Sequence, residues 1–432
     1  MPAPGLDPSP RRYSPSVTLV RRSARGAAAA PERTTVDEIE AWLLGAAVRE
    51  NDLLALFESL AWRAVAAGLP LDRASLHVGT LHPELFGFAW NWSRSDGLCD
   101  EIRVTQASLE SDSYKRNPLY RVLEYGEAFR GDTRDPAVAG AYPLMAELAA
   151  QGITDYIAHP IGGGETYHNA ATVATRRAEG FADADVASIE RLLRLFALHV
   201  ERHIVLRIVG NVLDTYLGRA AGGRVLEGSI RRGSGEAIRA VIWISDLRGF
   251  TDLTDRLAGP DVTALLNAYF ERLAGAVLGH GGEVLKFIGD GLLAVFPLAS
   301  STDPERDAAK AALAAAEEAL AAIEALNGEP PASLRDIAGW QPLRTGIALH
   351  EGEVFFGNVG APERLDFTVI GRAVNEASRV EALCKTLGHS ILITEPVARR
   401  LDRPLDGLGR HPLRGLAQPI ALFSPAGPGE AT

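Results

Sequence analysis

The feature that most constrains the fold is a stretch without glycine or proline over residues 183–209, DADVASIERLLRLFALHVERHIVLRIV. Its apolar residues recur every three or four positions, which predicts one amphipathic helix roughly 40 Å long. The apolar residues of this stripe are Ile189, Leu193, Phe196, Val200, Ile204 and Ile208. We expect the first half of the helix to pack on the preceding domain and the second half to form a two-stranded coiled coil.

This helix separates two halves of different character, and a chain of 432 residues is long enough for two or three domains. We predict a disordered basic arm at 1–34, an α+β domain at 35–182, a signalling helix and connector at 183–236, and an α/β domain at 237–425. The Gly- and Arg-rich end of the third segment predicts an irregular connector. The arm carries six arginines against two acids, so the alternative to a disordered tail is weak contact with acidic lipid or a partner.

Composition limits the classes of function. A formal net charge of -11 argues against nucleic-acid binding by charge attraction. Two distant cysteines suggest no disulfide framework and fit a reducing compartment. There is neither a bilayer-spanning apolar run nor a signal-peptide core, so we expect a cytoplasmic protein without a membrane span.

Residues 35–182 read as helices followed by alternating segments such as ASLHVGTL and LFGFAWNWS, which predicts a helix-flanked antiparallel sheet. The order of elements resembles GAF/PAS small-molecule sensors. That resemblance implies a pocket for a small-molecule regulator, and the alternative is a pure dimerisation module. Trp90 and Trp92 share one strand face as core or pocket wall. Other residues show no metal-ligand spacing and are expected to be structural: His77, His82, Cys99, His159 and His168.

Residues 237–425 alternate strands and helices. AVIWIS predicts a buried strand that ends at Asp246, and EVLKFIGDGLLAVFP predicts a hairpin with Asp290 in its turn. LRTGIALHEGEVFFGNV predicts a second hairpin. Two carboxylates that meet across a sheet repel each other unless a cation lies between them. Oxygen ligands with room for substrate oxygens suit Mg²⁺ at a phosphate site.

Four successive blocks carry a resemblance to the class III nucleotide cyclases. The blocks are WISDLRGFTDLTD, GGEVLKFIGDGLLAVF, LRTGIALHEGEVFFGNVGAPERLDFTVIGRAVNEASRVE and LRGLAQPIALF. The resemblance implies a ferredoxin-like α/β domain that dimerises, with active sites at the homodimer interface. It also implies synthesis of a 3′,5′-cyclic nucleotide and pyrophosphate with two Mg²⁺ or Mn²⁺ ions per site.

The resemblance assigns roles to residues of the second half. Asp246 and Asp290 match the metal-binding aspartates, and Lys286 matches the lysine that reads the base. Lysine donates to N1 of adenine, whereas N1 of guanine carries a hydrogen, so Lys286 favours ATP over GTP. The second base-reading position is Thr368, as in the class IIIb subset, some of whose members respond to bicarbonate. Asp366 lies two residues earlier on the same strand face and ranks below Thr368 as a stand-in.

Asn375 and Arg379 are four residues apart on a helix and share one face. They match the pair that orients the ribose and stabilises charge on the α-phosphate. Arg414, in LRGLA, is a looser match to a residue that holds the terminal phosphates. In the family, the aspartates and the lysine of one chain serve different sites, so Lys286 and Asp290 are not expected to pair.

Other readings remain open. Guanylate cyclase activity is one alternative to adenylate cyclase activity. A catalytically silent nucleotide-binding module that only transmits a signal is another. A diguanylate cyclase is a third, but HGGEVLKF has Val284 and Leu285 where that family has an acid and an aromatic residue.

Overall fold

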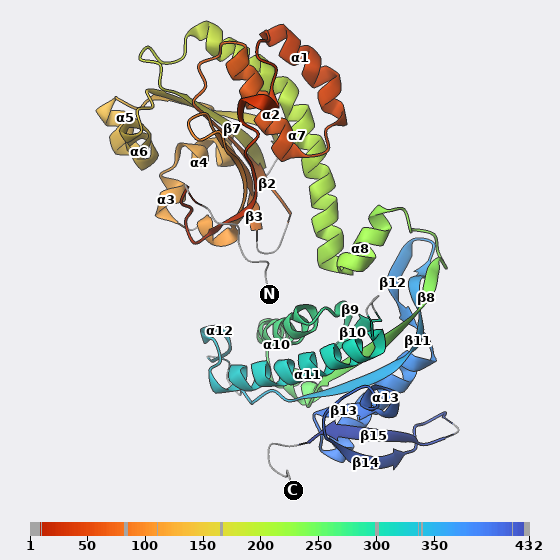
Figure 1. The fold of residues 1–432 in the computed structure, drawn as a ribbon. Helices are drawn as coiled ribbons and strands as arrows, with labels where there is room; N and C mark the ends of the chain where they lie inside the picture. Colours follow the sequence, from red (N-terminus) through yellow and green to blue (C-terminus); the bar gives the residue numbers. More distant parts are fainter. Residues whose placement is uncertain are drawn as a thin grey trace. The chain divides into compact units, whose positions relative to one another are not determined.

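The computed structural model describes residues 9, 11–81, 85–109, 111–164, 167–298, 302–335, 337, 340–416 and 418–426, without the side chains of 163, 164 and 167. His82 lies outside the described residues. The chain divides into two units, Met1–Val212 and Leu213–Thr432, called the N-terminal and C-terminal units below (Figure 1).

The described residues of the N-terminal unit form an antiparallel sheet in the order β1-β4-β3-β2-β7-β6-β5. Its strands are β1 Val17–Ser23, β2 Arg73–Gly79, β3 Leu85–Ser93, β4 Cys99–Thr105, β5 Phe129–Asp132, β6 Asp155–Gly164 and β7 Tyr167–Thr175. Its helices are α1 Val36–Leu44, α2 Leu53–Ala66, α3 Asp112–Lys115, α4 Pro118–Tyr125, α5 Pro136–Ala141 and α6 Pro143–Ala150, with 3-10 turns at Gly26–Ala29, Ala46–Arg49 and Gln106–Ser108.

Helices cover both faces of this sheet, as the sequence predicted. α1, α2 and the long helix α7 (Asp183–Leu217) share one apolar core with the strands. α4 and α6 share a separate core with β6 and β7. Strands therefore alternate side chains between two cores rather than between a core and water.

The prediction of a disordered arm at 1–34 is wrong for residues 17–23, which form the edge strand β1 against β4. The arginines that suggested a solvated tail instead pair with acids of the sheet and of α2. Arg21 contacts Glu101, Arg22 contacts Asp100 and Arg25 contacts Glu58, and these three acids are fully buried. Burial of an acid requires a partner, and the arm supplies it.

The long helix extends further than predicted, to Leu217. The predicted stripe packs into the N-terminal core at Ile189, Leu193, Phe196 and Val200, and Ile204 is partly buried there. A different face of the helix is exposed: Leu198 is 61%, Val205 58% and Val209 40% accessible. These three positions are spaced by seven and four residues, which is a heptad spacing. A coiled coil would therefore use this second face rather than the stripe that the sequence suggested.

The described residues of the C-terminal unit form a mixed sheet in the order β14-β15-β13-β11-β8-β10-β9, with β12 paired to β11. β11 and β13 are parallel, and the other pairs are antiparallel. The strands are β8 Gly235–Leu247, β9 Glu283–Ile288, β10 Gly291–Pro297, β11 Thr345–Ala361, β12 Arg364–Ile370, β13 Ile391–Thr394, β14 Leu405–His411 and β15 Ile420–Pro425. The helices are α8 Arg219–Leu226, α9 Phe250–Thr254, α10 Gly259–Gly279, α11 Pro304–Gly328, α12 Ala332–Arg335, α13 Arg372–Leu387 and α14 Glu395–Ala398.

Cover on both faces explains why residues 240–244 of β8 are all apolar. Val241 and Trp243 join the core beneath α10 and α11, whereas Ala240 and Ile242 join the core beneath α8 and α13. A strand covered on both faces loses the polar alternation of a half-exposed strand.

Two predictions for this unit are corrected and one is confirmed. LRTGIALHEGEVFFGNV is not a hairpin: it forms the single strand β11, which pairs with β8 from Thr345 to Gly357, and the chain reverses between β11 and β12. The predicted irregular connector contains α8, because Ala221 is buried against the sheet and packing outweighs the low helix propensity of its glycines. The hairpin β9–β10 forms as predicted.

Candidate active site

Asp246 and Asp290 lie side by side. Asp246 is near the end of β8, Asp290 is in the turn between β9 and β10, and β10 pairs with β8. Gly289 adopts a φ of 63° in this turn, a left-handed conformation that favours glycine. At Gly291 a Cβ would lie 3.3 Å from Oδ1 of Asp246, so the turn lies directly against the strand end.

The neighbouring Asp290 perturbs the carboxyl group of Asp246. Partial burial, followed by the charge and the hydrogen bond of Asp290, raises the pKa of Asp246 to about 6. Like charges at such short range resist ionising together, and a cation between them would relieve the repulsion. Carboxylate oxygens are the donors that Mg²⁺ prefers, so this pair fits a divalent ion. Among the described residues no group of three or more His, Cys, Asp or Glu side chains is placed to hold a metal, so water and substrate would supply the other ligands.

A third acid, which the sequence did not single out, lies near the pair. Glu381 is on α13, and burial together with the negative charge of Asp246 raises its pKa to about 7. Gly346, opposite Asp246 in the sheet, leaves room for it: a Cβ there would lie 2.7 Å from Oε1 of Glu381. The available signal was a carboxyl group four residues after Ala377, on a helix face that is otherwise apolar.

A buried hydrogen-bond chain supports the strand that carries Asp246. The Thr345 hydroxyl donates to the backbone oxygen of Asp246 at 2.9 Å. Because that donation uses its hydrogen, Thr345 accepts from the hydroxyl of Tyr269 at 2.7 Å. Tyr269 and Thr345 are both buried, so α10 holds the strand end in place from within the core.

Lys286 pairs with a residue other than Asp290. Its amino group forms an ion pair with Asp366, which reaches it from β12. Thr368 lies two residues further along the same strand face and is buried at 7% exposure. The structure therefore brings Lys286 to Asp366, the position that the sequence ranked below Thr368.

Asn375 and Arg379 lie on α13, where Asn375 is exposed and Arg379 is half-buried. The turn at Arg414 and Gly415 lies beside Arg379, since a Cβ at Gly415 would be 3.6 Å from both Nη atoms of Arg379. In the described part of the chain, no hydrogen bond or ion pair joins Asn375 or Arg379 to the aspartate pair. The structure thus groups the predicted residues into three places: the aspartates, the Lys286 strand pair, and α13 with the Arg414 turn.

Residues 236–418 match the family model of the Adenylate and Guanylate cyclase catalytic domain. The matched residues all lie in the C-terminal unit. An adenylate cyclase of Anabaena cylindrica is 35% identical over 176 residues, which cover 41% of this chain and 33% of that protein. Adenylate cyclase 1 of Rhizobium meliloti is 34% identical over 155 residues, 35% of this chain and 22% of that protein.

This chain spans about a third or less of the length of these two relatives. Among solved structures, the guanylyl cyclase Cya2 is 30% identical with a TM-score of 0.39, and the match covers 46% of this chain and 96% of that chain. The N-terminal unit lies outside the family match. No helix in the described part of either unit has both the length and the apolar character that crossing a bilayer requires.

Proposed function

We propose that this chain is an adenylate cyclase that converts ATP to 3′,5′-cyclic AMP and pyrophosphate and works as a homodimer. The observation that carries the proposal is the adjacent carboxyl pair Asp246 and Asp290, at a strand end and a glycine turn within the cyclase domain. Two acids this close destabilise the site unless a cation is bound.

Asp246 and Asp290 would hold two divalent ions, Mg²⁺ or Mn²⁺. When bound, such ions would make the ribose 3′-hydroxyl a better nucleophile and neutralise charge on the phosphates. The remaining contributions come from side chains of this chain, in the following way.

Lys286 reads the base by donating a hydrogen bond to N1 of adenine. Asp366 or Thr368 accepts from the adenine amino group, in a base-reading pair like that of class IIIb. Guanylate cyclase activity is a second candidate because of one observation: the Asp366 carboxylate beside Lys286 is an acceptor that N1–H of guanine also fits. The selectivity between adenine and guanine depends on whether Asp366 or Thr368 contacts the base.

Asn375 orients the ribose, and Arg379 stabilises the charge that develops on the α-phosphate. Loss of one such group typically lowers the rate on the order of a hundredfold or more. Arg414, in the turn beside Arg379, holds the terminal phosphates.

A second copy of the chain completes the site. Among the described residues no hydrogen bond or ion pair joins Asn375 or Arg379 to the aspartates of their own chain, so each centre would combine groups from two protomers. Large apolar side chains near the ends of β9 and β12 are exposed: Phe287 at 51%, Ile288 at 59% and Ile370 at 46%. Exposed apolar clusters of this kind mark interaction surfaces, which supports dimerisation here. The N-terminal unit regulates that alignment.

The test is release of cyclic nucleotide and pyrophosphate by the purified full-length chain, with ATP and GTP compared in Mg²⁺ and in Mn²⁺. We expect cyclic AMP as the main product and a loss of at least a hundredfold in Asp290→Asn. Asp406→Asn is the matched control, because Asp406 is an exposed acid on the edge strand β14. Binding of ATP without pyrophosphate release would favour the silent module, and preferential use of GTP would favour the guanylate cyclase.

A further inference from the structure

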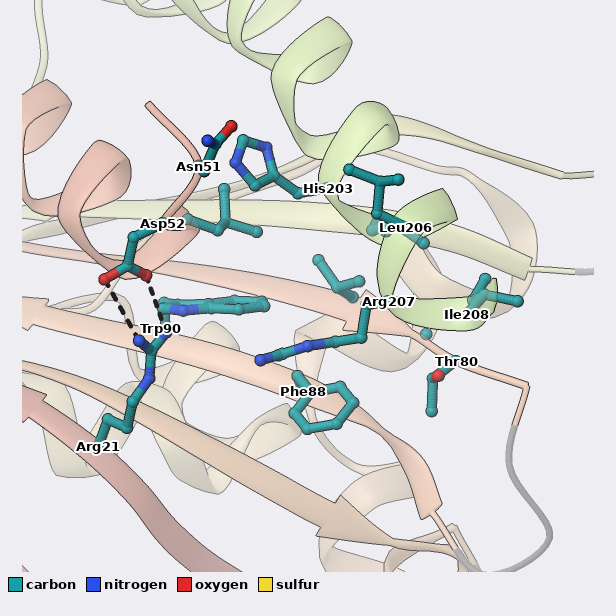
Figure 2. A pocket seen from close by; sticks show the side chains of 14 residues that line it. Arg21, Asn51, Asp52, Thr80, Phe88, Trp90, His203, Leu206, Arg207 and Ile208 are labelled. Carbon is teal, nitrogen blue, oxygen red and sulfur yellow. Dashed lines mark hydrogen bonds and ion pairs between the residues drawn. The ribbon is translucent and has the colours of Figure 1, made fainter. Parts of the chain in front are cut away.

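The N-terminal unit contains a cavity of about 320 Å³ between its sheet and α7. Residues of β1, β2, β3, α7 and the start of α2 line it, and all of them belong to this one unit. Figure 2 shows His203 and Arg207 approaching from α7, and Phe88 and Trp90 from β3. Cavities that hold small ligands typically measure about 300–1,000 Å³, so this one has room for a compact molecule.

One wall of the cavity is flat and aromatic. Phe88 and Trp90 are neighbours on the same face of β3, with ring centroids 6.5 Å apart. The guanidinium carbon of Arg207 lies 4.2 Å from the Phe88 ring centroid and 5.7 Å from that of Trp90. Aromatic rings and a planar guanidinium favour a planar ligand, which can stack on them.

Three buried polar atoms of the lining have no hydrogen-bond partner in the residues that the structure describes: Nε1 of Trp90, Nη1 of Arg207 and Nε2 of His203. The first two are donors. Nδ1 of His203 lies 2.7 Å from the backbone oxygen of His199, which can only accept, so Nδ1 carries the hydrogen. In the neutral form of the ring, Nε2 is then an acceptor. A buried polar group without a hydrogen bond costs free energy. A ligand that bonds to these two donors and one acceptor would remove that cost.

The charges around the cavity balance. Arg21 pairs with Asp52 and Glu101, and Arg207 pairs with the same Glu101. Two arginines therefore face two acids, and Glu101 is fully buried between them. With no surplus positive charge, the cavity disfavours phosphates and other anions, which would be buried uncompensated.

We propose that this cavity binds an uncharged planar heterocycle with a ring carbonyl next to a ring N–H, that is, a cyclic amide. The carbonyl oxygen accepts from Trp90 and Arg207, and the ring N–H donates to Nε2 of His203. The ring lies against Phe88 and Trp90. Because His203 and Arg207 belong to α7, which continues to Leu217, the bound molecule would join this helix to the sheet.

Calorimetric titration of the full-length chain tests the ligand class with three bicyclic probes. Lumazine is an uncharged cyclic amide, quinoxaline has the rings without the amide, and quinoxaline-2-carboxylate adds a negative charge. We expect one lumazine per chain and at least tenfold weaker binding of the other two, the effect of about one buried hydrogen bond. No saturable binding of lumazine at millimolar concentration, or binding of the carboxylate at least as tight, overturns the proposal.

A matched pair of variants tests the location. Trp90→Phe keeps an aromatic ring and removes the N–H, so lumazine binding should weaken about tenfold. Trp92→Phe makes the same change on the same strand, at a residue equally buried but outside the lining, and should leave binding unchanged. Equal effects of the two variants, or none, place the probe elsewhere and overturn the assignment. The readout is binding, so the outcome does not depend on cyclase activity.

Discussion

His77 makes the stability of the N-terminal unit sensitive to mild acid. The residue lies on β2 with Nε2 2.8 Å from the hydroxyl of Ser75, which in turn contacts Thr172. Burial lowers the pKa of the His77 imidazole to about 4, from an ordinary value of 6.5. The perturbation is a change from pH 7 to pH 5 in the wild type and in His77→Asn.

The sign follows from proton counting. Between pH 6.5 and 4 the unfolded chain binds a proton at His77 that the folded chain does not, so the free energy of unfolding falls as the pH falls. For these two pKa values the loss from pH 7 to pH 5 is about 2 kcal/mol. Because the side chain is not completely buried, solvent screening reduces the expected loss to about 1–2 kcal/mol.

Urea unfolding of the full-length chain at both pH values, followed by tryptophan fluorescence, measures this loss. Trp42, Trp62, Trp90 and Trp92 report on the N-terminal unit. His77→Asn should remove about 1–2 kcal/mol of the pH dependence. His159→Asn, in the same sheet, should keep it. An unchanged pH dependence in His77→Asn would refute the reasoning, because the imidazole would then ionise equally well in the folded and unfolded states.

Three further outcomes are expected. In metal-free buffer Asp290→Asn should raise the melting temperature by a few degrees, because it removes the like charge beside Asp246. Added Mg²⁺ should raise the melting temperature of the wild type but not that of the variant. A variant that is less stable than the wild type without metal would contradict this reasoning. Asp366→Ala should change the ratio of ATP to GTP turnover about tenfold, because the Asp366 carboxylate contacts Lys286. Thr368→Val should change that ratio less. A larger effect of Thr368→Val would indicate that Thr368 is the main base-reading partner of Lys286. Val205→Asp should weaken self-association at least tenfold in sedimentation, if the exposed face of α7 lies in the dimer; an unchanged dimer would exclude that face.

The structure brings the residues that the sequence singled out in the second half into three groups. Local patterns predicted some of these placements and not others. The β9–β10 hairpin follows from alternation and a glycine turn, so Asp290 was placed correctly in a turn. The pairing of β10 with β8, which brings that turn beside Asp246, was not predicted. The partner of Lys286 was not predictable, because Asp366 and Thr368 share one face of β12 and only the pairing of strands decides which lies within reach. Glu381 was missed because its significance depends on where α13 packs.

The sequence by itself determined much of the alternation of helices and strands, the long helix α7 and the similarity of residues 236–418 to adenylate and guanylate cyclase catalytic domains, because these depend on side-chain periodicity and on motifs of neighbouring residues. Tertiary structure decided the rest. It made residues 17–23 an edge strand, β11 a single strand, and Trp90 the wall of a cavity. Each of these depends on contacts between residues far apart in the chain, and such contacts set burial and charge pairing without leaving a local pattern.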